Sequence, residues 1–245
     1  MKIETRNLLG ELLVGALDDR TAAAALRCLA AYGRAVRKTP PAMSVDRFLL
    51  PAEEAERDEV LAFLRRHPLL SWDLRGRSGR VTLAPAFAAE YGEIVPKLVQ
   101  YGAALAEWRR DATAPALTTA LRKGALLFNH HLFFEVHEVL EAQWMKETGD
   151  ERRFLQGLIQ VAVAFYHLGN RNLRGALSLL QDGLAKLTPY QPAFLGVELR
   201  EFVADLEAHR AALARLTPGE VPQFRAEAIP RLRLSGSGRS GEGSS

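Results

Sequence analysis

The part of the chain that most constrains the fold lies between residues 128 and 167, where polar side chains interrupt an apolar helical pattern. This stretch reads FNHHLFFEVHEVLEAQWMKETGDERRFLQGLIQVAVAFYH and contains four of the six histidines. A polar group buried in a core costs free energy unless it is hydrogen-bonded. We therefore expect two packed helices whose polar residues have a structural or chemical role.

The spacing of these polar residues predicts that two consecutive helices bring them together. On a helix over 130–147, at about 100° per residue, His137 occupies a core position and Glu141 lies one turn further along the same side. When the chain turns back, Gln160 of the next helix comes level with His137, and Gln156 with Glu141. Glu135 lies almost opposite His137. The candidate site residues of the pair are Glu135, His137, Glu138, Glu141, Gln156, Gln160 and His167.

Three explanations of this polar cluster remain open. The first, which leads, is a buried structural network that fixes the register of the two helices. The second is a divalent metal site with His137, Glu141 and His167 as ligands, because the i, i+4 spacing lets two side chains hold one ion. The third is acid–base chemistry by a histidine beside a carboxylate. No nucleophile motif or phosphate-binding loop specifies a substrate, and the sequence calls for no cofactor.

Leucine and alanine recur at helical spacing through most of the chain, which predicts a mainly α protein. The expected helices cover about 5–17, 20–36, 52–66, 88–110, 116–128, 130–147, 151–168, 172–187 and 194–213. Short joints after residue 116 predict that neighbouring helices pack antiparallel in a bundle. We expect a small helical domain over 1–112, the bundle over 116–213 and a tail over 214–245, disordered from about residue 234, where glycine and serine dominate.

One β-hairpin interrupts the helical pattern of the N-terminal domain. The segment LLSWDLRGRSGRVTL, residues 69–83, has two short strand patterns around a glycine-rich tip. A hairpin that follows a helix and carries Arg75, Arg77 and Arg80 is typical of the wing of a winged-helix module that binds nucleic acid. The alternative is a hairpin that closes a small helical domain and has solvated arginines. The net charge of +3 and the pI near 9.2 are only weak support for nucleic-acid contact.

The remaining features concern the compartment. Cys28 is the single cysteine, so a disulfide framework or a thiolate metal cluster within one chain is excluded. Glu4, Arg6 and Glu11 interrupt the apolar character of the first residues, which is not the pattern of a signal peptide. No segment approaches the roughly 20 apolar residues of a membrane span. We expect a cytoplasmic protein without membrane contact.

The motifs FNHHLFFEVHEVLEAQW, FLQGLIQVAVAFYH and GNRNLRGAL resemble a bacterial and archaeal family, domain-of-unknown-function family 309. The resemblance runs from about Leu121 to Leu187 and implies a compact all-helical domain. The polar positions that it implies are the seven candidate site residues, with Asn170 and Gly175 beyond them. It implies no activity, and the first 115 residues fall outside it.

From the sequence we expect a soluble, non-catalytic binding or scaffold protein. The bundle would engage a protein partner, and the N-terminal domain would contact nucleic acid. The alternative is a metal-dependent or acid–base enzyme of the hydrolase type, which would use His137, Glu141, Gln160 and His167.

Overall fold

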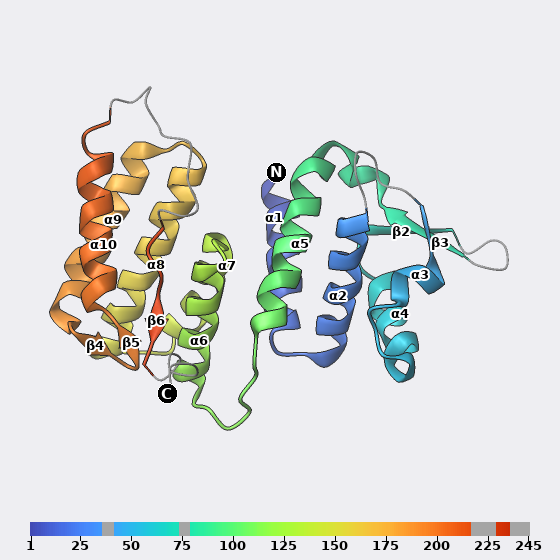
Figure 1. Cartoon of the computed structure of the whole chain (residues 1–245), viewed down its shortest axis with the longest axis horizontal. Coiled ribbons are helices and arrows are strands. Elements are labelled where there is room, and N and C mark those ends of the chain that lie inside the picture. The colour runs from blue at the N-terminus through green and yellow to red at the C-terminus, as the bar shows by residue number, and fades with distance from the viewer. Residues whose placement is uncertain (36–41, 74–78, 217–228, 236–245) are drawn as a thin grey trace, which may run out of the picture. The chain divides into compact units, whose positions relative to one another are not determined.

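The computed structural model describes residues 1–35, 42–73, 79–216 and 229–235 and forms two compact units, Met1–Arg110 and Asp111–Ser245 (Figure 1). Helices dominate both units, which confirms the mainly α class. Within the described ranges, no helix is both long enough and apolar enough to cross a bilayer. The hairpin tip at 74–78 and the glycine- and serine-rich end from 236 onward lie outside the described residues.

The first unit contains helices with a small sheet. Its elements are α1 (Ile3–Ala16), α2 (Arg20–Ala35), β1 (Met43–Ser44), α3 (Val45–Leu49), η1 (Glu54–Glu56), α4 (Arg57–Arg65), β2 (Leu70–Asp73), β3 (Arg80–Leu83), η2 (Pro85–Glu90) and α5 (Tyr91–Glu107). The two helices predicted first and the hairpin are confirmed. The helices predicted at 52–66 and 88–110 each begin with a 3₁₀ turn instead, and β1 and α3 were not predicted.

The sheet of the first unit has the topology of a winged helix. β3 pairs antiparallel with both β1 and β2, so the strand order is β1-β3-β2. α2, β1, α3, α4, β2 and β3 follow one another in the winged-helix order. Phe48 of α3 packs edge-on against Trp72 of the hairpin and against Tyr32 of α2, with ring centroids 6.0 and 5.8 Å apart. The hairpin is therefore part of the core of this unit.

A buried carboxylate connects α2 to the start of α4. Glu56 is 8% exposed and accepts hydrogen bonds from Arg20 and Arg27 of α2, at 3.2 and 3.1 Å. It also accepts from the backbone N–H of Glu53 at 3.2 Å, which completes the turn that precedes α4. A buried carboxylate needs such partners, because burial removes its hydration.

The second unit is a helical bundle with a small sheet at one end. Its elements are α6 (Ala116–Asn129), α7 (Phe133–Trp144), α8 (Gly149–Gly169), α9 (Leu173–Leu187), η3 (Thr188–Tyr190), β4 (Ala193–Phe194), β5 (Val197–Glu198), α10 (Arg200–Leu213) and β6 (Arg233–Leu234). Four of the five predicted helices are confirmed. The fifth was predicted to begin at 194, but residues 193–198 form a hairpin whose turn has positive φ at Leu195 (+50°) and Gly196 (+78°). Helical backbone has negative φ, so the helix begins only after this turn.

The bundle core is built around aromatic rings. Phe128 of α6 packs edge-on against Phe133 of α7, Phe165 of α8 and Phe202 of α10, with centroid distances of 5.2, 5.7 and 5.5 Å. One ring of α6 thus contacts three further helices, which positions α7 and α8 relative to the remainder of the bundle.

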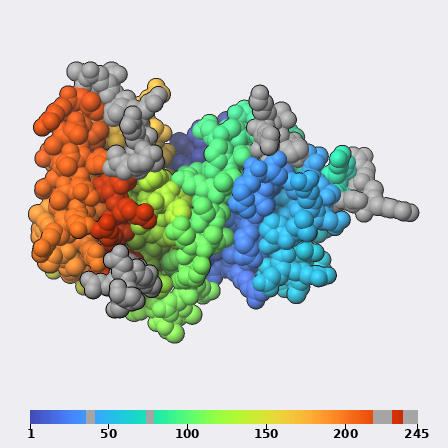
Figure 2. Space-filling model, in the orientation of Figure 1, coloured from blue at the N-terminus to red at the C-terminus, as the bar shows by residue number. Residues whose placement is uncertain are grey.

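Residues 229–235 return to the bundle and complete its small sheet. β6 pairs with β5, and the red segment in Figure 2 lies between orange α10 and green α6. The side chain of Asn129 at the end of α6 donates to the carbonyl of Leu232 and accepts from its N–H, both at 2.9 Å. Ile229 and Leu232 are buried. The sequence analysis assigned residues 214–245 to a tail and did not predict that part of it joins this sheet.

Candidate functional site

α7 and α8 pack antiparallel, as the sequence predicted. Phe134 near the start of α7 contacts Tyr166 near the end of α8, with ring centroids 6.0 Å apart. At the other end of the pair, the Arg152 guanidinium of α8 stacks over the Trp144 ring of α7 at 3.7 Å. The turn between them has Gly149 at φ +58°, a conformation that glycine adopts without strain. The middle of α7, with His137, therefore lies level with the middle of α8.

His137 lies between two carboxylates at the surface of the bundle. Its Nδ1 is 3.1 Å from Glu138 Oε1, and its Nε2 is 3.4 Å from Glu141 Oε2. The three side chains are 29%, 43% and 45% exposed. The interaction expected between His137 and Glu141 is present, but the expectation that the cluster is buried is wrong.

The reason is the orientation of α7. Val136, Val139 and Leu140 face the core. His137 follows Val136 by one residue, about 100° around the helix, and is therefore turned to the edge of the buried stripe.

Glu135 is separated from the exposed cluster. It is fully buried, at 0% exposure, and the same unit buries Lys123 of α6 and Gln143 of α7. The Gln143 side chain donates to Glu147, one turn later. The prediction that Glu135 lies on the opposite side of the helix from His137 agrees with this burial. Glu135 therefore belongs to the bundle interior.

Gln160 and Gln156 of α8 are partly exposed, and the predicted hydrogen-bond network does not include the Gln160 amide oxygen. This oxygen is buried and has no hydrogen-bond partner among the described residues. Val163 and Tyr166 continue the same partly exposed stripe toward the end of α8. An unsatisfied buried acceptor is unusual, because each one costs about 1–3 kcal/mol.

His167 belongs to the turn between α8 and α9. Its Nδ1 lies 3.1 Å from the side-chain nitrogen of Asn172, which caps α9 by accepting from the N–H of Gly175 at 3.0 Å. A Cβ at Gly175 would lie 2.6 Å from the Asn172 amide, so this cap requires glycine. Asn170 donates its side-chain N–H to the Tyr166 carbonyl, at 3.0 Å.

His137 and Glu141 do not form part of a larger ligand set. Throughout the described ranges, no three His, Cys, Asp or Glu side chains are placed to hold a metal ion. His167, the predicted third ligand, therefore does not join the other two.

The outward sides of the two helices form one continuous surface. Its residues on both helices are partly or fully exposed, and the stripes touch at both ends through the Phe134–Tyr166 and Trp144–Arg152 contacts. We call this surface the α7–α8 face; it comprises Phe134, His137, Glu138, Glu141, Ala142 and Met145 of α7 and Gln156, Ile159, Gln160, Val163, Tyr166 and His167 of α8.

Of the predicted wing residues, the structure describes Arg80. It is exposed at the start of β3, opposite Ser44 and Asp73 in the sheet register. Arg75 and Arg77 lie outside the described residues. The N–H of Val45 donates to the Gly79 carbonyl at 3.2 Å, so the base of the hairpin adjoins the start of α3.

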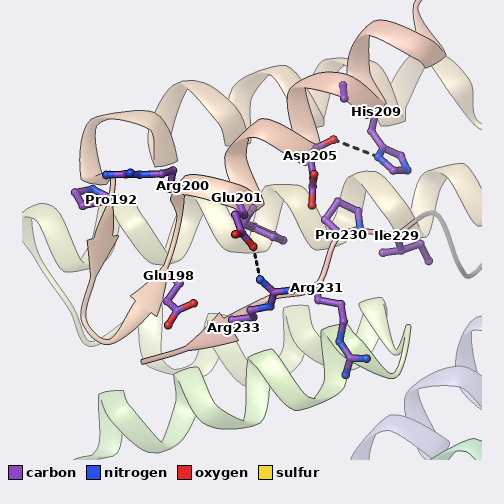
Figure 3. Close-up of a pocket in the computed structure, with 12 residues that line it drawn as sticks. Pro192, Glu198, Arg200, Glu201, Asp205, His209, Ile229, Pro230, Arg231 and Arg233 are labelled. Carbon is purple, nitrogen blue, oxygen red and sulfur yellow. Dashed lines mark hydrogen bonds and ion pairs between the residues drawn. The ribbon is translucent and has the colours of Figure 1, made fainter. Parts of the chain in front are cut away.

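A groove of about 590 Å³ that the sequence did not predict lies between α10 and the segment 229–235 (Figure 3). Arg233 forms an ion pair with Glu201 across it, and His209 Nδ1 lies 3.2 Å from the backbone carbonyl of Asp205. Sequence reasoning missed the groove because one wall is the returning segment, for which no periodic pattern exists. Side chains of both charges line it, so it favours no single class of ligand.

The described geometry defines a class of protein: a mainly α chain in which one unit is a helical bundle with an exposed, largely polar two-helix face, and the other is a helical unit with a three-stranded sheet. Residues 121–179 match the model of a family described as "Domain of unknown function (DUF309)", which confirms the resemblance stated from the motifs. The match runs from α6 into α9 and includes all of α7 and α8.

A curated relative is similar to part of the chain. Uncharacterized protein YpuF of Bacillus subtilis (strain 168) is 40% identical over 53 residues, which are 21% of this chain. The match covers 30% of that relative, so the chain spans less than a third of its length.

Proposed function

We propose that the bundle is a non-catalytic binding domain that docks a protein partner on the α7–α8 face. The observation that carries the proposal is the exposure of its polar residues. Except for the buried Glu135, the candidate site residues lie on the outward stripes of two antiparallel helices. Residues with a purely structural role would instead be enclosed and fully hydrogen-bonded.

The composition of the face supports this proposal. Met145 is 65% exposed, and the partly buried rings of Phe134 and Tyr166 contact each other at the opposite end. Apolar and aromatic side chains between polar groups are typical of protein–protein interfaces. His137 stacks on Phe134 at 6.3 Å, which holds both rings in place.

The enzyme alternative has less support. Its one favourable feature is the contact of His137 with Glu138 and Glu141, which could orient an imidazole for proton transfer. These groups are open to solvent, whereas electrostatic catalysis is strongest in a site that excludes water.

Affinity capture with charge-reversed variants tests the proposal. Glu138→Lys changes the face, and Glu207→Lys makes the same change at an exposed position of α10. We expect the wild type and Glu207→Lys to retain the same set of proteins from cells of the source organism. Glu138→Lys should lose this set. If all three retain the same proteins in equal amounts, the α7–α8 face is not the docking surface.

We propose as a second function that the first unit contacts nucleic acid through its hairpin. The winged-helix strand order and the exposed Arg80 at the hairpin base support this proposal. α4, which corresponds to the recognition helix of a winged helix, begins with exposed Asp58 and Glu59. Because these carboxylates repel phosphates, contact through the hairpin is expected to lack sequence specificity.

Salt-dependent binding to a duplex DNA measures this second function. Replacing Arg75, Arg77 and Arg80 by alanine should weaken DNA binding and make it less sensitive to salt. The slope of the logarithm of the binding constant against the logarithm of the salt concentration should become shallower by about 0.9 for each phosphate that the protein no longer neutralises. Replacing three arginines elsewhere, at positions 171, 174 and 210, controls for net charge. A wild type that does not bind DNA at low salt contradicts the proposal.

A further inference from the structure

We infer that the occupant of the α7–α8 face is an amphipathic helix of the partner, with a lysine or arginine beside its apolar stripe. This inference rests on the proposed function and specifies the chemistry of the partner. Three features of the face support it: its shape, its charge and one unsatisfied acceptor.

The shape of the face suits a third helix. α7 and α8 run antiparallel and in contact, and a partner helix can pack along two such helices. Apolar side chains occur along the whole length of the face: Phe134 and Tyr166 at one end, Ile159 and Val163 in the middle and Met145 at the other end. α7 has 12 residues, and a helix of that length is about 18 Å long, which a partner helix of some three to four turns would match.

The charge of the face is negative at its centre. Glu138 and Glu141 are carboxylates on the middle turns of α7, and both are more than 40% exposed. Arg152, a cation in the first turn of α8, is already engaged. Its guanidinium stacks on Trp144 and donates to the carbonyls of Trp144 and Glu147, at 2.9 and 3.3 Å.

His137 cannot satisfy both carboxylates when it is neutral. A neutral imidazole has one N–H, so it can donate to Glu138 or to Glu141 but not to both. The other carboxylate then faces a ring nitrogen without a proton and is left to solvent. An ammonium or guanidinium group of a partner can replace water as its donor and complements the charge of both carboxylates.

Gln160 provides the third feature. Its amide oxygen, on the same face, is shielded from solvent and has no hydrogen-bond partner in the described part of the chain. Because the Gln160 side chain is partly exposed, rotation of its amide toward solvent would bring this oxygen within reach of a polar side chain at the edge of a bound helix. An all-apolar partner would offer it no donor.

Charge also distinguishes this occupant from others. A nucleic acid would bring phosphates to Glu138 and Glu141, and a second copy of the same face would bring carboxylates. Both are repelled by like charge. A basic amphipathic helix gains from the carboxylates and from the apolar residues together.

Selection from a peptide library tests this inference on the full-length chain. The probe is a yeast-displayed library of amphipathic helices of about 18 residues, with a fixed leucine stripe and flanking positions randomised among Lys, Arg, Gln and Glu. We expect selected peptides to carry Lys or Arg at one flank. Their affinity should fall about tenfold for Glu138→Gln/Glu141→Gln, the scale of two partly exposed ion pairs. Glu207→Gln, on α10, is the matched control and should leave the affinity unchanged.

The outcomes separate this inference from the proposed function. If peptides bind without a basic preference, but Met145→Ser weakens them, the face binds helices and the charge assignment is wrong. If neither Met145→Ser nor the double glutamine variant changes binding, both the inference and the proposed function fail. Circular dichroism of each variant confirms folding, and all the substituted side chains are exposed enough for this to be expected.

Discussion

His131 is a residue whose protonation is coupled to the folding of the bundle. It joins α6 to α7 in the left-handed conformation, at φ +57°, and its N–H donates to the Phe128 carbonyl at 2.9 Å. Partial burial lowers the pKa of His131 below its ordinary value of 6.5, and the nearby positive charges of His130 and Arg231 lower it further. The folded bundle therefore favours the neutral imidazole.

We expect His131→Asn to reduce the acid sensitivity of the bundle. Because the folded pKa is lower than the unfolded one, the unfolded chain binds more protons between the two values. The contribution to stability is complete above the unfolded pKa of 6.5 and is lost as the pH falls through the folded pKa. Asparagine tolerates left-handed backbone, so the turn should persist. The fall in Tm between about pH 7.5 and about pH 5 should be smaller in the variant than in the wild type.

A second histidine provides the control for this prediction. His209→Asn changes a histidine of α10, and it should not reproduce the effect. His67 of the first unit also has a pKa lowered by burial, so the measurement must follow the transition of the bundle alone. An equal fall in Tm for the wild type and His131→Asn would contradict the assignment.

For single residues, residue type and spacing predicted which polar side chains share a helix face. They did not predict how far that face is turned toward solvent. The proximity of His137 and Glu141 follows from helical periodicity alone. Burial depends on which side of α7 meets the rest of the bundle, and that is determined by Phe128, whose ring contacts α7, α8 and α10 together. A local pattern carries no information on such long-range packing.

At the scale of elements, α8 and α9 pack closely because each has a glycine at their crossing. A Cβ at Gly183 of α9 would lie 2.8 Å from Val161 Cγ2 and 3.0 Å from the Gly157 carbonyl oxygen. A Cβ at Gly157 of α8 would lie 2.9 Å from Leu187 Cδ2. Backbone atoms approach side chains directly at both positions, and the helices cannot separate without exposing their apolar faces.

We expect Gly183→Ala to destabilise the bundle by about 1–3 kcal/mol, although alanine is the better helix former. The added methyl group would overlap a backbone oxygen, which cannot rotate away as a side chain can. Gly169→Ala, near the end of α8, is the matched control. A Cβ there meets no atom within 4 Å, so that variant should be neutral or more stable by up to about 1 kcal/mol. Urea denaturation of both variants measures the difference, and equal stabilities would show that the crossing is adaptable.

Helices and strands that depend on the local sequence pattern were predicted, whereas those that depend on pairing with distant residues were not. Long amphipathic helices such as α2, α8 and α9 were predicted to within a few residues, because their patterns are local. β1 and β6 were missed: each is two residues long and exists through pairing with a strand far away in the chain. The pairing of Asn129 with Leu232 was not predicted for the same reason, because the two residues are 103 positions apart.

At the scale of the whole molecule, the chain consists of two units with separate cores. The core of the first includes Leu26, Val60 and Leu64, and the core of the second includes Phe128 and Leu140. The division falls between Arg110 and Asp111, and from the sequence it was expected between residues 112 and 116. Composition does not show that the sheet of the first unit has the order β1-β3-β2, which depends on the pairing of β1 with β3.

Separate cores predict that the two units unfold as separate cooperative transitions. Leu26 of α2 and Leu140 of α7 are both 0% exposed, and truncating a leucine in such a position to alanine costs about 2–5 kcal/mol. Leu26→Ala should lower one transition in a calorimetric scan, and Leu140→Ala the other. The substitution His131→Asn should change the acid sensitivity of the same unfolding transition that Leu140→Ala lowers, because both residues belong to the bundle. If both leucine variants instead lower a single shared transition by similar amounts, the two cores unfold together, and the stability of the bundle is thermodynamically coupled to that of the first unit.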